Sequence, residues 1–439
     1  MARKIKFEIS KFDKITPGGQ ALGTLENGKK IFAWGVLLNE TAKIQITKSK
    51  SSFVEGFAVE IFESSPERIE PKDKESFLST SPWQIFNFDF EQKIKQELIF
   101  ESFRQEKIEL KNQEDFYSDG KIFEYRNKVE FSFWWEKSEE NENDGELSLA
   151  FFKRGGKGKI PVFGTSLATP EINQAGQKVL AILRDRKTAS RDLKTLLIRA
   201  NQKGEISAQL YAKDEKFKPF SKKEIASLGF KNFEIIFSNP KSPASVITKK
   251  IQSQNQENLQ DSVLGVNFNY ATESFFQINL PVYEQALRDM KKFIDVSKPT
   301  VDLYSGVGSI GLTIGAGDLT LVEINEPAVE EMRRNITELG REKTAKAVLS
   351  PSEKALDFIK KGANLIVDPP RAGMNREVCE KILEIEPEKV IYLSCNPTTQ
   401  ARDVAILSKK YEIIYSRGYN FFPRTPHIEN LIILELKNQ

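Results

Sequence analysis

Between residue 300 and the end of the chain, short apolar runs alternate with segments of helical spacing. The apolar runs, at 300–303, 319–323, 345–349, 364–367 and 390–393, have the length of buried strands. The helical segments that follow them cover 327–339, 352–361, 376–383 and 398–409. This alternation predicts a parallel sheet, because each crossover helix returns the chain to the same sheet edge. Two final strand-like runs, 412–419 and 430–436, have no helix between them, so we expect an antiparallel pair that completes seven strands.

A glycine loop follows the first of these strands. Gly306, Gly308 and Gly311 have the G-x-G-x-x-G spacing that lets a nucleotide approach the backbone at a helix start. No Lys-Ser pair follows, which excludes a phosphate-cradling P-loop. Glu323 ends the next strand, where its carboxylate could accept both hydroxyls of a ribose. NAD and S-adenosylmethionine sites share these features; the closing strand pair and the Asp368-Pro-Pro turn favour S-adenosylmethionine.

A cysteine occupies the end of another strand. Cys395 follows the run 390–393 and precedes a helix whose first turn can hold Pro397. The positive end of that helix could lower the thiol pKa and raise the thiolate fraction. The alternative is a buried, inert cysteine, which is the expected role of Cys379 on the preceding helix. Asp368 ends a neighbouring strand, so functional residues at several strand ends favour a reactive Cys395.

The rest of the chain has a different pattern. Residues 1–65 alternate short strands with glycine-rich turns, which predicts a small closed β-barrel of the kind that holds oligonucleotides. Residues 66–262 mix strands and helices as an α+β domain, with 252–260 as a polar loop. We therefore expect three domains, the last being 263–439, with a helix near 91–110 that can pack on it.

Composition restricts the class of protein. A net charge of +3 does not establish a nucleic-acid partner, but basic clusters at 3–14, 48–50 and 153–159 could hold a polyanion. No apolar run is long enough to span a bilayer, so no membrane partner is expected. The 2 cysteines do not suggest a disulfide framework. We expect a cytoplasmic protein, acting as a monomer.

Taken together, the motifs resemble one family, the uracil-C5 RNA methyltransferases that form 5-methyluridine. The matching segments are YRNK at 125–128, SFFQIN at 274–279, DLYSGVG at 302–308, DPPRAG at 368–373, SCNP at 394–397 with ARD at 401–403, and FPRTPHIE at 422–429. The resemblance implies an α/β class I, Rossmann-like methyltransferase domain, an α+β central domain and an N-terminal OB-like TRAM barrel. It implies S-adenosylmethionine contacts at Gln277, Tyr304, Glu323 and Asp368, a nucleophile at Cys395 and a base at Glu429.

This assignment implies a specific chemistry. Addition of the Cys395 thiolate to uracil C6 makes C5 nucleophilic, so that C5 can take a methyl group. Glu429 then removes the C5 proton, and elimination frees the enzyme. The target uridine must leave its stack, so a loop or remodelled RNA is expected. Phe275, Phe276, Phe421 and Phe422 could stack on bases, although we expect core positions for most of them.

Alternative readings of the substrate, the activity and His427 have to be weighed. A TRAM barrel is more usual on enzymes of 23S rRNA, which we favour over tRNA. A non-catalytic RNA-binding protein on the same fold is a second reading, opposed by the intact Cys395, Glu429 and Asp368. A DNA cytosine-C5 methyltransferase is a third reading, but those enzymes carry Pro-Cys where this chain has Ser-Cys-Asn-Pro at 394–397. For His427, the single histidine, a loop-fixing hydrogen bond is favoured over catalysis.

The chain departs from the family pattern at one place. Many TRAM-bearing members bind a four-iron cluster through three cysteines after the barrel and a fourth in the central domain. The corresponding stretches here, 71–84 and 151–169, contain no cysteine. Because such clusters are held by thiolates, we expect no iron–sulfur cluster.

Overall fold

The chain forms two compact units. The computed structural model describes residues 5–111, 113–137, 145–156, 158–243, 245–254 and 257–437, so Arg3, Lys4 and Lys157 of the basic clusters lie outside the described residues. Unit 1 comprises Met1–Glu91, Ile122–Leu259 and Arg424–Pro426, and unit 2 comprises Gln92–Lys121, Gln260–Pro423 and His427–Gln439. The three-domain division at residues 65 and 262 stays a prediction.

Unit 1 begins with a small barrel, which confirms the expectation for residues 1–65. Its strands are β1 (Lys6–Ile15), β2 (Ala21–Thr24), β3 (Lys30–Trp34), β4 (Thr41–Ser49) and β5 (Phe53–Glu63). The described strands close in the order β1-β2-β3-β5-β4. Alternate residues point inward, so Phe12, Ile31 and Ile44 are fully buried. A short helix, α1 (Phe77–Thr80), lies in the connector that follows.

The second part of unit 1 is a mixed sheet with helices on one face. Its described strands run in the order β12-β11-β10-β9-β6-β7-β8. They are β6 (Lys128–Lys137), β7 (Gly145–Phe152), β8 (Lys159–Pro161), β9 (Leu193–Ala200), β10 (Ile206–Ala212), β11 (Asn232–Phe237) and β12 (Lys249–Gln254). The helices α3 (Pro170–Asp185) and α4 (Lys222–Leu228), with the turn η1 (Ser190–Asp192), complete it. Ile172, Val179 and Leu183 of α3 pack on the apolar face of this sheet.

The expectation of a loop at 252–260 is wrong at both ends of that segment. β12 continues to Gln254, and β13 (Leu259–Val263) begins at Leu259 and pairs with β14 (Val266–Tyr270), while residues 255–256 lie outside the described residues. The polar side chains do not prevent pairing, because backbone groups form the ladder. Gln252, for example, lies opposite Ile235 of β11, and its side-chain amide bonds both backbone groups of Phe220.

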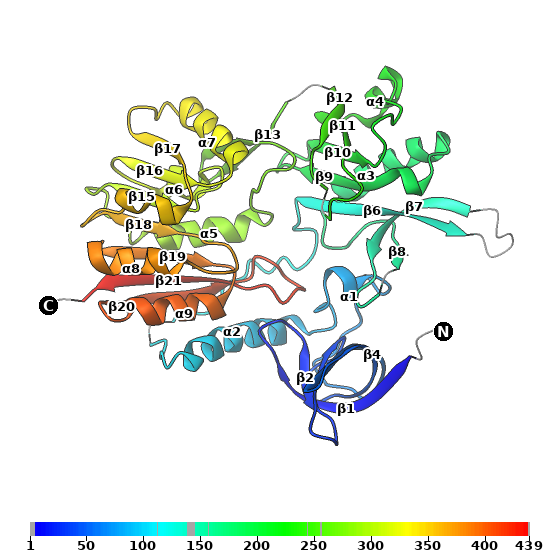
Figure 1. Cartoon of the computed structure of the whole chain (residues 1–439), viewed down its shortest axis with the longest axis horizontal. Helices are drawn as coiled ribbons and strands as arrows, with labels where there is room; N and C mark the ends of the chain where they lie inside the picture. The colour runs from blue at the N-terminus through cyan, green and yellow to red at the C-terminus, as the bar shows by residue number, and fades with distance from the viewer. Residues whose placement is uncertain are drawn as a thin grey trace. The chain divides into compact units, whose positions relative to one another are not determined.

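Unit 2 contains the predicted seven-stranded sheet (Figure 1). Its described strands run in the order β17-β16-β15-β18-β19-β21-β20. They are β15 (Thr300–Leu303), β16 (Leu319–Glu323), β17 (Ala345–Leu349), β18 (Asn364–Val367), β19 (Lys389–Ser394), β20 (Tyr411–Tyr419) and β21 (Glu429–Leu436). β15 to β19 are parallel, and β21 is antiparallel to both β19 and β20, which confirms the closing pair.

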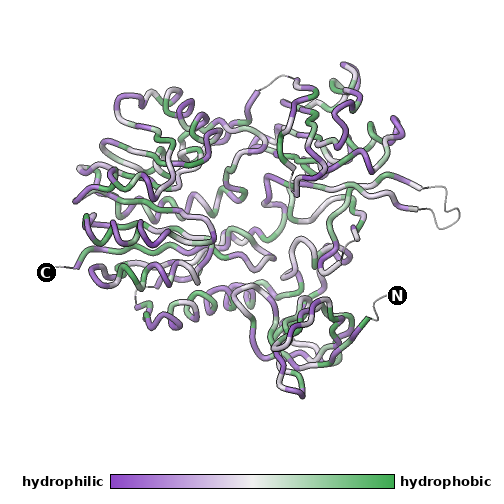
Figure 2. Tube along the Cα trace, viewed as in Figure 1, coloured by the Kyte–Doolittle hydropathy of each residue, from purple (hydrophilic) through white to green (hydrophobic). Residues whose placement is uncertain are grey.

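The helices of unit 2 are α2 (Phe88–Gln105, from Gln92 on), α5 (Leu280–Lys291), α6 (Ser309–Ile314), α7 (Glu326–Glu338), α8 (Arg376–Ile385) and α9 (Pro397–Leu407). Hydrophobic residues follow the strands of the sheet, and hydrophilic residues alternate along the covering helices (Figure 2). The ammonium of Lys95 on α2 donates to Asn420 Oδ1 at 2.7 Å, and both residues belong to unit 2. Among the described residues, no helix is long and apolar enough to cross a membrane.

One predicted helix, 352–361, is wrong. The segment forms two short 3₁₀ turns, η2 (Ser352–Lys354) and η3 (Leu356–Phe358), separated at Ala355. Only Ser352, Ala355 and Ile359 are buried in this stretch. That is too little apolar surface to stabilise a longer helix.

Candidate active site

The candidate site lies at the carboxyl edge of the unit 2 sheet. The parallel register aligns Leu303 of β15 with Val322 of β16 and Val367 of β18, and aligns Val367 with Tyr392 of β19. Glu323 and Asp368 directly follow Val322 and Val367, and Gly306 and Cys395 come three residues after Leu303 and Tyr392, so the topology places them along one edge. This is where open α/β sheets bind ligands.

Cys395 and Glu429 come together through the antiparallel register of β19 and β21. Ser394 of β19 lies directly opposite Asn430 of β21. Cys395 directly follows the end of β19 and Glu429 begins β21, so their backbones are neighbours although 33 residues lie between them in the chain. Glu429 is only 4% exposed and Cys395 is half-buried. The structure thus places a thiol beside an enclosed carboxyl group.

Glu429 belongs to a group of carboxyls that are difficult to ionise. Burial raises the pKa of Glu429 well above its usual range, and the nearby Asp368 raises it further, with Arg371 opposing. Burial also raises the pKa of Asp368 to about 7. A buried carboxylate close to another carboxylate keeps its proton to higher pH. Glu429 therefore resists ionisation while it is buried beside Asp368.

Asp302 is a third carboxyl that is difficult to ionise, and the sequence analysis did not identify it as part of the site. Its side chain is fully buried in β15; Oδ2 accepts from the Gly311 backbone N–H at 2.9 Å, while Oδ1 has no hydrogen-bond partner. Burial raises the pKa of Asp302 to about 8, with Asp368 and Glu323 contributing. The sequence did contain an indication of this, because an acidic residue within the strand-forming run TVDL is rarely buried without a structural or functional role.

The expected lowering of the Cys395 pKa is wrong for the site as it stands. Burial raises the pKa of the thiol to about 12, and Glu429 and Asp368 raise it further, while Arg371 lowers it. The start of α9 does not outweigh desolvation and two neighbouring acids. The thiol is therefore protonated at neutral pH until the charge balance of the site changes.

The glycine loop and Glu323 form one hydrogen-bonded unit. The Glu323 carboxylate accepts from the backbone N–H groups of Gly306 at 2.9 Å and of Ile324 and Asn325 at 2.8 Å. Gly306 has a φ of +56°, and a Cβ added there would meet nothing within 4 Å. Gly308 has a φ of +86°, and a Cβ there would lie 2.9 Å from Leu312 Cδ1. The first glycine leaves open space beside the backbone, and the second permits close packing of α6, as a nucleotide site requires.

Tyr304 lies just before Gly306 in the chain, and Gln277 lies before α5. Tyr304 adopts a φ of +63°, unusual for a residue with a side chain. Burial raises its pKa to about 12, with a hydrogen bond to Ser352 opposing. Gln277 is buried between β14 and α5, and two residues later Asn279 donates to the Phe421 carbonyl at 3.2 Å. The segment of Gln277 therefore lies against the loop that leads to Glu429.

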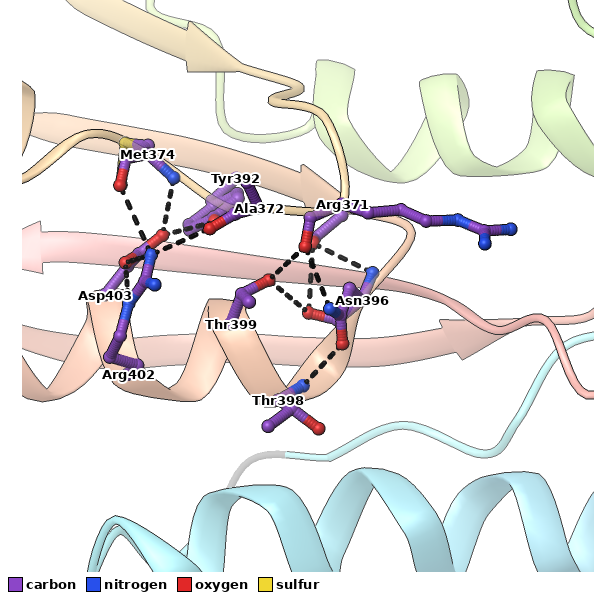
Figure 3. Close-up of polar contacts among 10 residues, drawn as sticks. Arg371, Ala372, Met374, Tyr392, Asn396, Thr398, Thr399, Arg402 and Asp403 are labelled. Atoms are coloured by element: carbon purple, nitrogen blue, oxygen red, sulfur yellow. Dashed lines mark hydrogen bonds and ion pairs between the residues drawn. The ribbon is translucent and has the colours of Figure 1, made fainter. Parts of the chain in front are cut away.

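The loop after Asp368 is held by side chains of α9 (Figure 3). Asp403 Oδ2 accepts from the backbone N–H of Met374 and the hydroxyl of Tyr392, both at 2.8 Å. Arg402 pairs with Asp403 and donates to the carbonyls of Ala372 and Met374. A Cβ on Gly373 would lie 2.6 Å from Asp403 Oδ2, which explains that glycine. Arg402 and Asp403 of the ARD motif thus hold the loop that follows Asp368.

Arg371 extends its guanidinium away from this loop while its carbonyl stays anchored (Figure 3). The carbonyl accepts from Asn396 Nδ2 at 2.9 Å and from Thr399 Oγ1 at 3.2 Å. Arg371 Nη2 lies 3.2 Å from His427 Nδ1, and the His427 ring meets Phe422 edge to face. His427 therefore contacts Arg371, whose charge lowers the pKa values of Cys395 and Glu429. Sequence reasoning left this role of Arg371 unassigned.

The four phenylalanines differ in burial. Phe276 and Phe421 are buried, and Phe276 stacks on Tyr270 with centroids 4.3 Å apart. Phe422 is partly buried, and Phe275 is 71% exposed. Cys379 is fully buried on α8, and burial raises its pKa to about 12, so its packing role is confirmed.

The stretches aligned with the family's cluster cysteines form a hydrogen-bonded network instead. Asp73 Oδ2 accepts from Thr165 Oγ1 at 3.1 Å and from Ser166 Oγ at 2.9 Å. Gln84 Nε2 donates to Asp73 Oδ2 at 3.0 Å and to Ser81 Oγ at 2.7 Å. These oxygen and amide groups do not fit an iron–sulfur cluster, which needs thiolates. Among the described residues no group of metal-binding side chains gathers.

We therefore predict that the purified protein is colourless and contains no stoichiometric iron. The reason is chemical, because the network supplies no thiolate to bind iron. Anaerobic purification followed by metal and sulfide analysis checks this. One or more equivalents of both iron and sulfide would contradict it.

Comparisons with known proteins agree with this geometry. The family model described as tRNA (Uracil-5-)-methyltransferase matches residues 87–437. An uncharacterised RNA methyltransferase of Caldanaerobacter subterraneus is 27% identical over 97% of this chain and 98% of its own length. One from Fusobacterium nucleatum is 28% identical, over 97% and 95%. The solved tRNA (uracil-54, C5)-methyltransferase of Pyrococcus abyssi, in complex with S-adenosyl-L-homocysteine, superposes with a TM-score of 0.75 at 20% identity, covering 97% of this chain and 100% of that one.

Proposed function

Because the chain belongs to the tRNA (uracil-5-)-methyltransferase family, we propose that Cys395 and Glu429 transfer a methyl group to C5 of a uracil in RNA. The activity class follows from the family: the protein is an S-adenosylmethionine-dependent RNA (uracil-5-)-methyltransferase. The residue roles rest on one observation, the Ser394–Asn430 register that sets the Cys395 thiol beside the Glu429 carboxyl. A nucleophile and a base at neighbouring positions match the two chemical steps at C6 and C5 of one ring.

The reaction proceeds through the substrate base. The Cys395 thiolate adds to C6 of uracil, which makes C5 nucleophilic, and C5 takes the methyl group of S-adenosylmethionine. Glu429 removes the C5 proton, the C6–S bond breaks, and the Cys395 thiolate leaves from 5-methyluracil. Atoms and charge balance: the thiol proton of Cys395 leaves to solvent when the thiolate forms and returns after elimination, and the C5 proton passes to Glu429 and then to solvent. Asp368, raised in pKa beside Glu429, forms the wall that holds the base and the donor.

Deprotonation of Cys395 needs a change in the local charge. Its pKa of about 12 reflects burial and two neighbouring acids, with Arg371 as the opposing cation. The donor's sulfonium is a second cation, and a cation near a thiol favours the thiolate. We infer that Cys395 becomes reactive only after the donor binds. Without the donor, the thiol stays protonated and does not react with other electrophiles.

The donor would be held by Glu323, the glycine loop, Gln277, Tyr304 and Asp368. Glu323→Ala should weaken S-adenosylmethionine binding by about 1–3 kcal/mol, because hydrogen bonds from two ribose hydroxyls to a charged group are lost. Isothermal titration calorimetry measures this. Glu326→Ala, an exposed acid on the first turn of α7, is the control and should bind normally. Unchanged affinity of Glu323→Ala would contradict the assignment.

The raised pKa values also predict a proton linkage. At pH 7, Asp302 (pKa about 8) is mostly protonated and Asp368 (pKa about 7) is half protonated. A bound sulfonium favours the ionised carboxylates, so binding should release up to about one proton and tighten as pH rises from 6 to 8. S-adenosylhomocysteine lacks that charge and should release fewer protons.

Calorimetry in buffers of different ionisation heat measures the proton release. Asp302→Asn removes one titrating group, and its acceptor oxygen can still take the Gly311 N–H bond. The variant should therefore bind both ligands with a smaller difference in proton release. Equal release for the two ligands in the wild type would show that the sulfonium does not lie near these carboxyls.

For the RNA target we favour 23S rRNA, supported by the closed N-terminal barrel, which we propose is a TRAM-like RNA-binding domain. The solved neighbour that acts on uracil 54 of tRNA keeps tRNA as the second candidate. Comparing 5-methyluridine in purified 23S rRNA and tRNA from a strain lacking the gene distinguishes the two. We propose that the enzyme acts as a monomer in the cytoplasm.

A further inference from the structure

Asn335 on α7 makes hydrogen bonds that the proposed chemistry does not use. α7 lies against β14, and Asn335 is fully buried. Its Oδ1 accepts from the backbone N–H of Asn269 on β14 at 2.9 Å, and its Nδ2 donates to the Asn269 carbonyl at 3.3 Å. One side chain therefore satisfies both backbone groups of a strand residue, as a neighbouring strand would.

The same amide also reaches the glycine loop. Asn335 Nδ2 donates to the carbonyl of Val307, which lies between Gly306 and Gly308, at 3.4 Å. The backbone N–H of Gly308 belongs to the same peptide unit and donates to the Ser305 carbonyl at 2.8 Å. The planar peptide that joins Val307 to Gly308 is therefore held on both sides, which fixes its orientation in the loop.

Asn335 thus joins two segments that lead into the proposed donor site. Val307 lies within the glycine loop, and Asn269 comes eight residues before Gln277 in the chain. The glycine loop and Gln277 are both proposed donor contacts. A loop that is fixed before the ligand arrives loses less conformational entropy when the ligand binds. Without the Asn335 amide, that loss of entropy would fall on the binding step.

We propose that Asn335 is a positioning residue, which holds the glycine loop in its donor-binding conformation by tying the loop to β14. This inference rests on the proposed function for the place of S-adenosylmethionine at the glycine loop. Asn335 acts through the loop and not on the reacting atoms. Its loss should therefore raise the KM for S-adenosylmethionine and leave kcat unchanged at saturating donor.

The chain offers a matched control at the opposite edge of the same sheet. Asn364 begins β18 and is also buried. Its Oδ1 accepts from the Asp295 N–H at 2.9 Å, and its Nδ2 donates to the Asp295 carbonyl at 2.9 Å and to Thr300 Oγ1 at 3.4 Å. The two asparagines make equivalent bonds, but Asn364 stands where the parallel strands begin, whereas the glycine loop stands where they end.

The test compares full-length Asn335→Ala and Asn364→Ala with the wild type by thermal unfolding, calorimetry and methyl-transfer kinetics. Both variants should unfold at a lower temperature, because each loses bonds to buried backbone groups. Asn335→Ala alone should bind S-adenosylmethionine and S-adenosylhomocysteine about ten-fold more weakly, since the two ligands share the nucleoside that the loop contacts. Its KM for the donor should rise by the same factor.

Asn335→Asp provides a second variant, which keeps the acceptor for the Asn269 N–H and serves if the alanine variant does not fold. Its carboxylate has no hydrogen to donate, whereas the protonated carboxyl donates one. Burial favours the protonated form. The ratio of its Kd for S-adenosylmethionine to the wild-type Kd should therefore fall as the pH is lowered from about 8 to about 6. A loss of stability alone does not produce that change.

Glu323→Ala separates the positioning role from the donor assignment. Equal affinities of Asn335→Ala and Asn364→Ala while Glu323→Ala binds weakly, or a lower kcat of Asn335→Ala without weaker binding, would overturn the positioning role alone. Normal binding by Glu323→Ala as well would overturn the donor assignment together with it. The predicted affinities without 5-methyluridine formation would support the role of Asn335 and count against the proposed function of Cys395 and Glu429.

Discussion

Cys395→Ala should lose methyl transfer by roughly three orders of magnitude or more and should form no covalent complex with RNA. Without the thiolate there is no addition at C6, and C5 of uracil is too electron-poor to attack the donor. Transfer of labelled methyl groups to RNA measures the first effect, and denaturing gel electrophoresis measures the second. Binding of RNA should persist, because the thiol contributes little to affinity.

The second cysteine provides the control. Cys379→Ala leaves a small cavity on α8 and should cost about 1 kcal/mol of stability while activity is retained. If Cys395→Ala still gave a covalent complex, or Cys379→Ala alone abolished it, the nucleophile would have to be reassigned.

Glu429→Gln should fail at a later step and accumulate a methylated covalent complex. Glutamine has the same shape but does not accept the C5 proton, so addition and methyl transfer proceed and elimination stops. A complex that resists denaturation and carries the labelled methyl group should therefore appear, with turnover reduced by about two to four orders of magnitude. The Ser394–Asn430 register is the reason to place this base beside Cys395.

Glu331→Gln is the control for a buried acid, since Glu331 also has a pKa raised by burial and lies outside the pair. It accepts from Ala271 N–H and Ser274 Oγ, bonds that a glutamine oxygen can keep, so turnover should persist. Normal turnover by Glu429→Gln would refute its role as the base. Failure to add at all would assign Glu429 to activation of the thiol instead.

Much of this site could be predicted from the sequence because its parts stand at strand ends. An apolar run such as 390–393 predicts a buried strand from its own residues. The parallel order of the strands then brings Asp368 and Cys395 to one edge of the sheet. The closing antiparallel pair, visible as two strand runs without a helix, returns Glu429 to the same edge. Local pattern and topology therefore point to the same edge, while the roles of Cys395, Glu429 and Asp368 stay predictions.

The electrostatics could not be predicted in the same way. The pKa of Cys395 depends on Glu429 and Asp368, which are distant in sequence, and on burial that no local pattern reports. The helix start seen beside the cysteine was the weaker influence. Likewise, the failed helix at 352–361 and the failed loop at 252–260 were decided by partners elsewhere in the fold, where tertiary contacts override local propensity.

The ARD motif shows a different limit. Its residues act on the site through other residues. Arg402 and Asp403 hold the loop that follows Asp368, and position 373 is a glycine because Asp403 fills the space that a side chain would need. The sequence shows that these residues accompany the cysteine, but only the three-dimensional contacts show that they shape the wall of the pocket.

The most direct measurement of the central claim uses RNA that carries 5-fluorouridine at the target position, with S-adenosylmethionine and the wild-type enzyme. Fluorine at C5 gives Glu429 no proton to remove, so the account predicts that addition and methyl transfer occur and the complex cannot resolve. Protease and nuclease digestion followed by mass spectrometry should find the methylated fluorouridine on the peptide that contains Cys395. An unmodified Cys395 peptide, or an adduct on any other residue, would contradict the account.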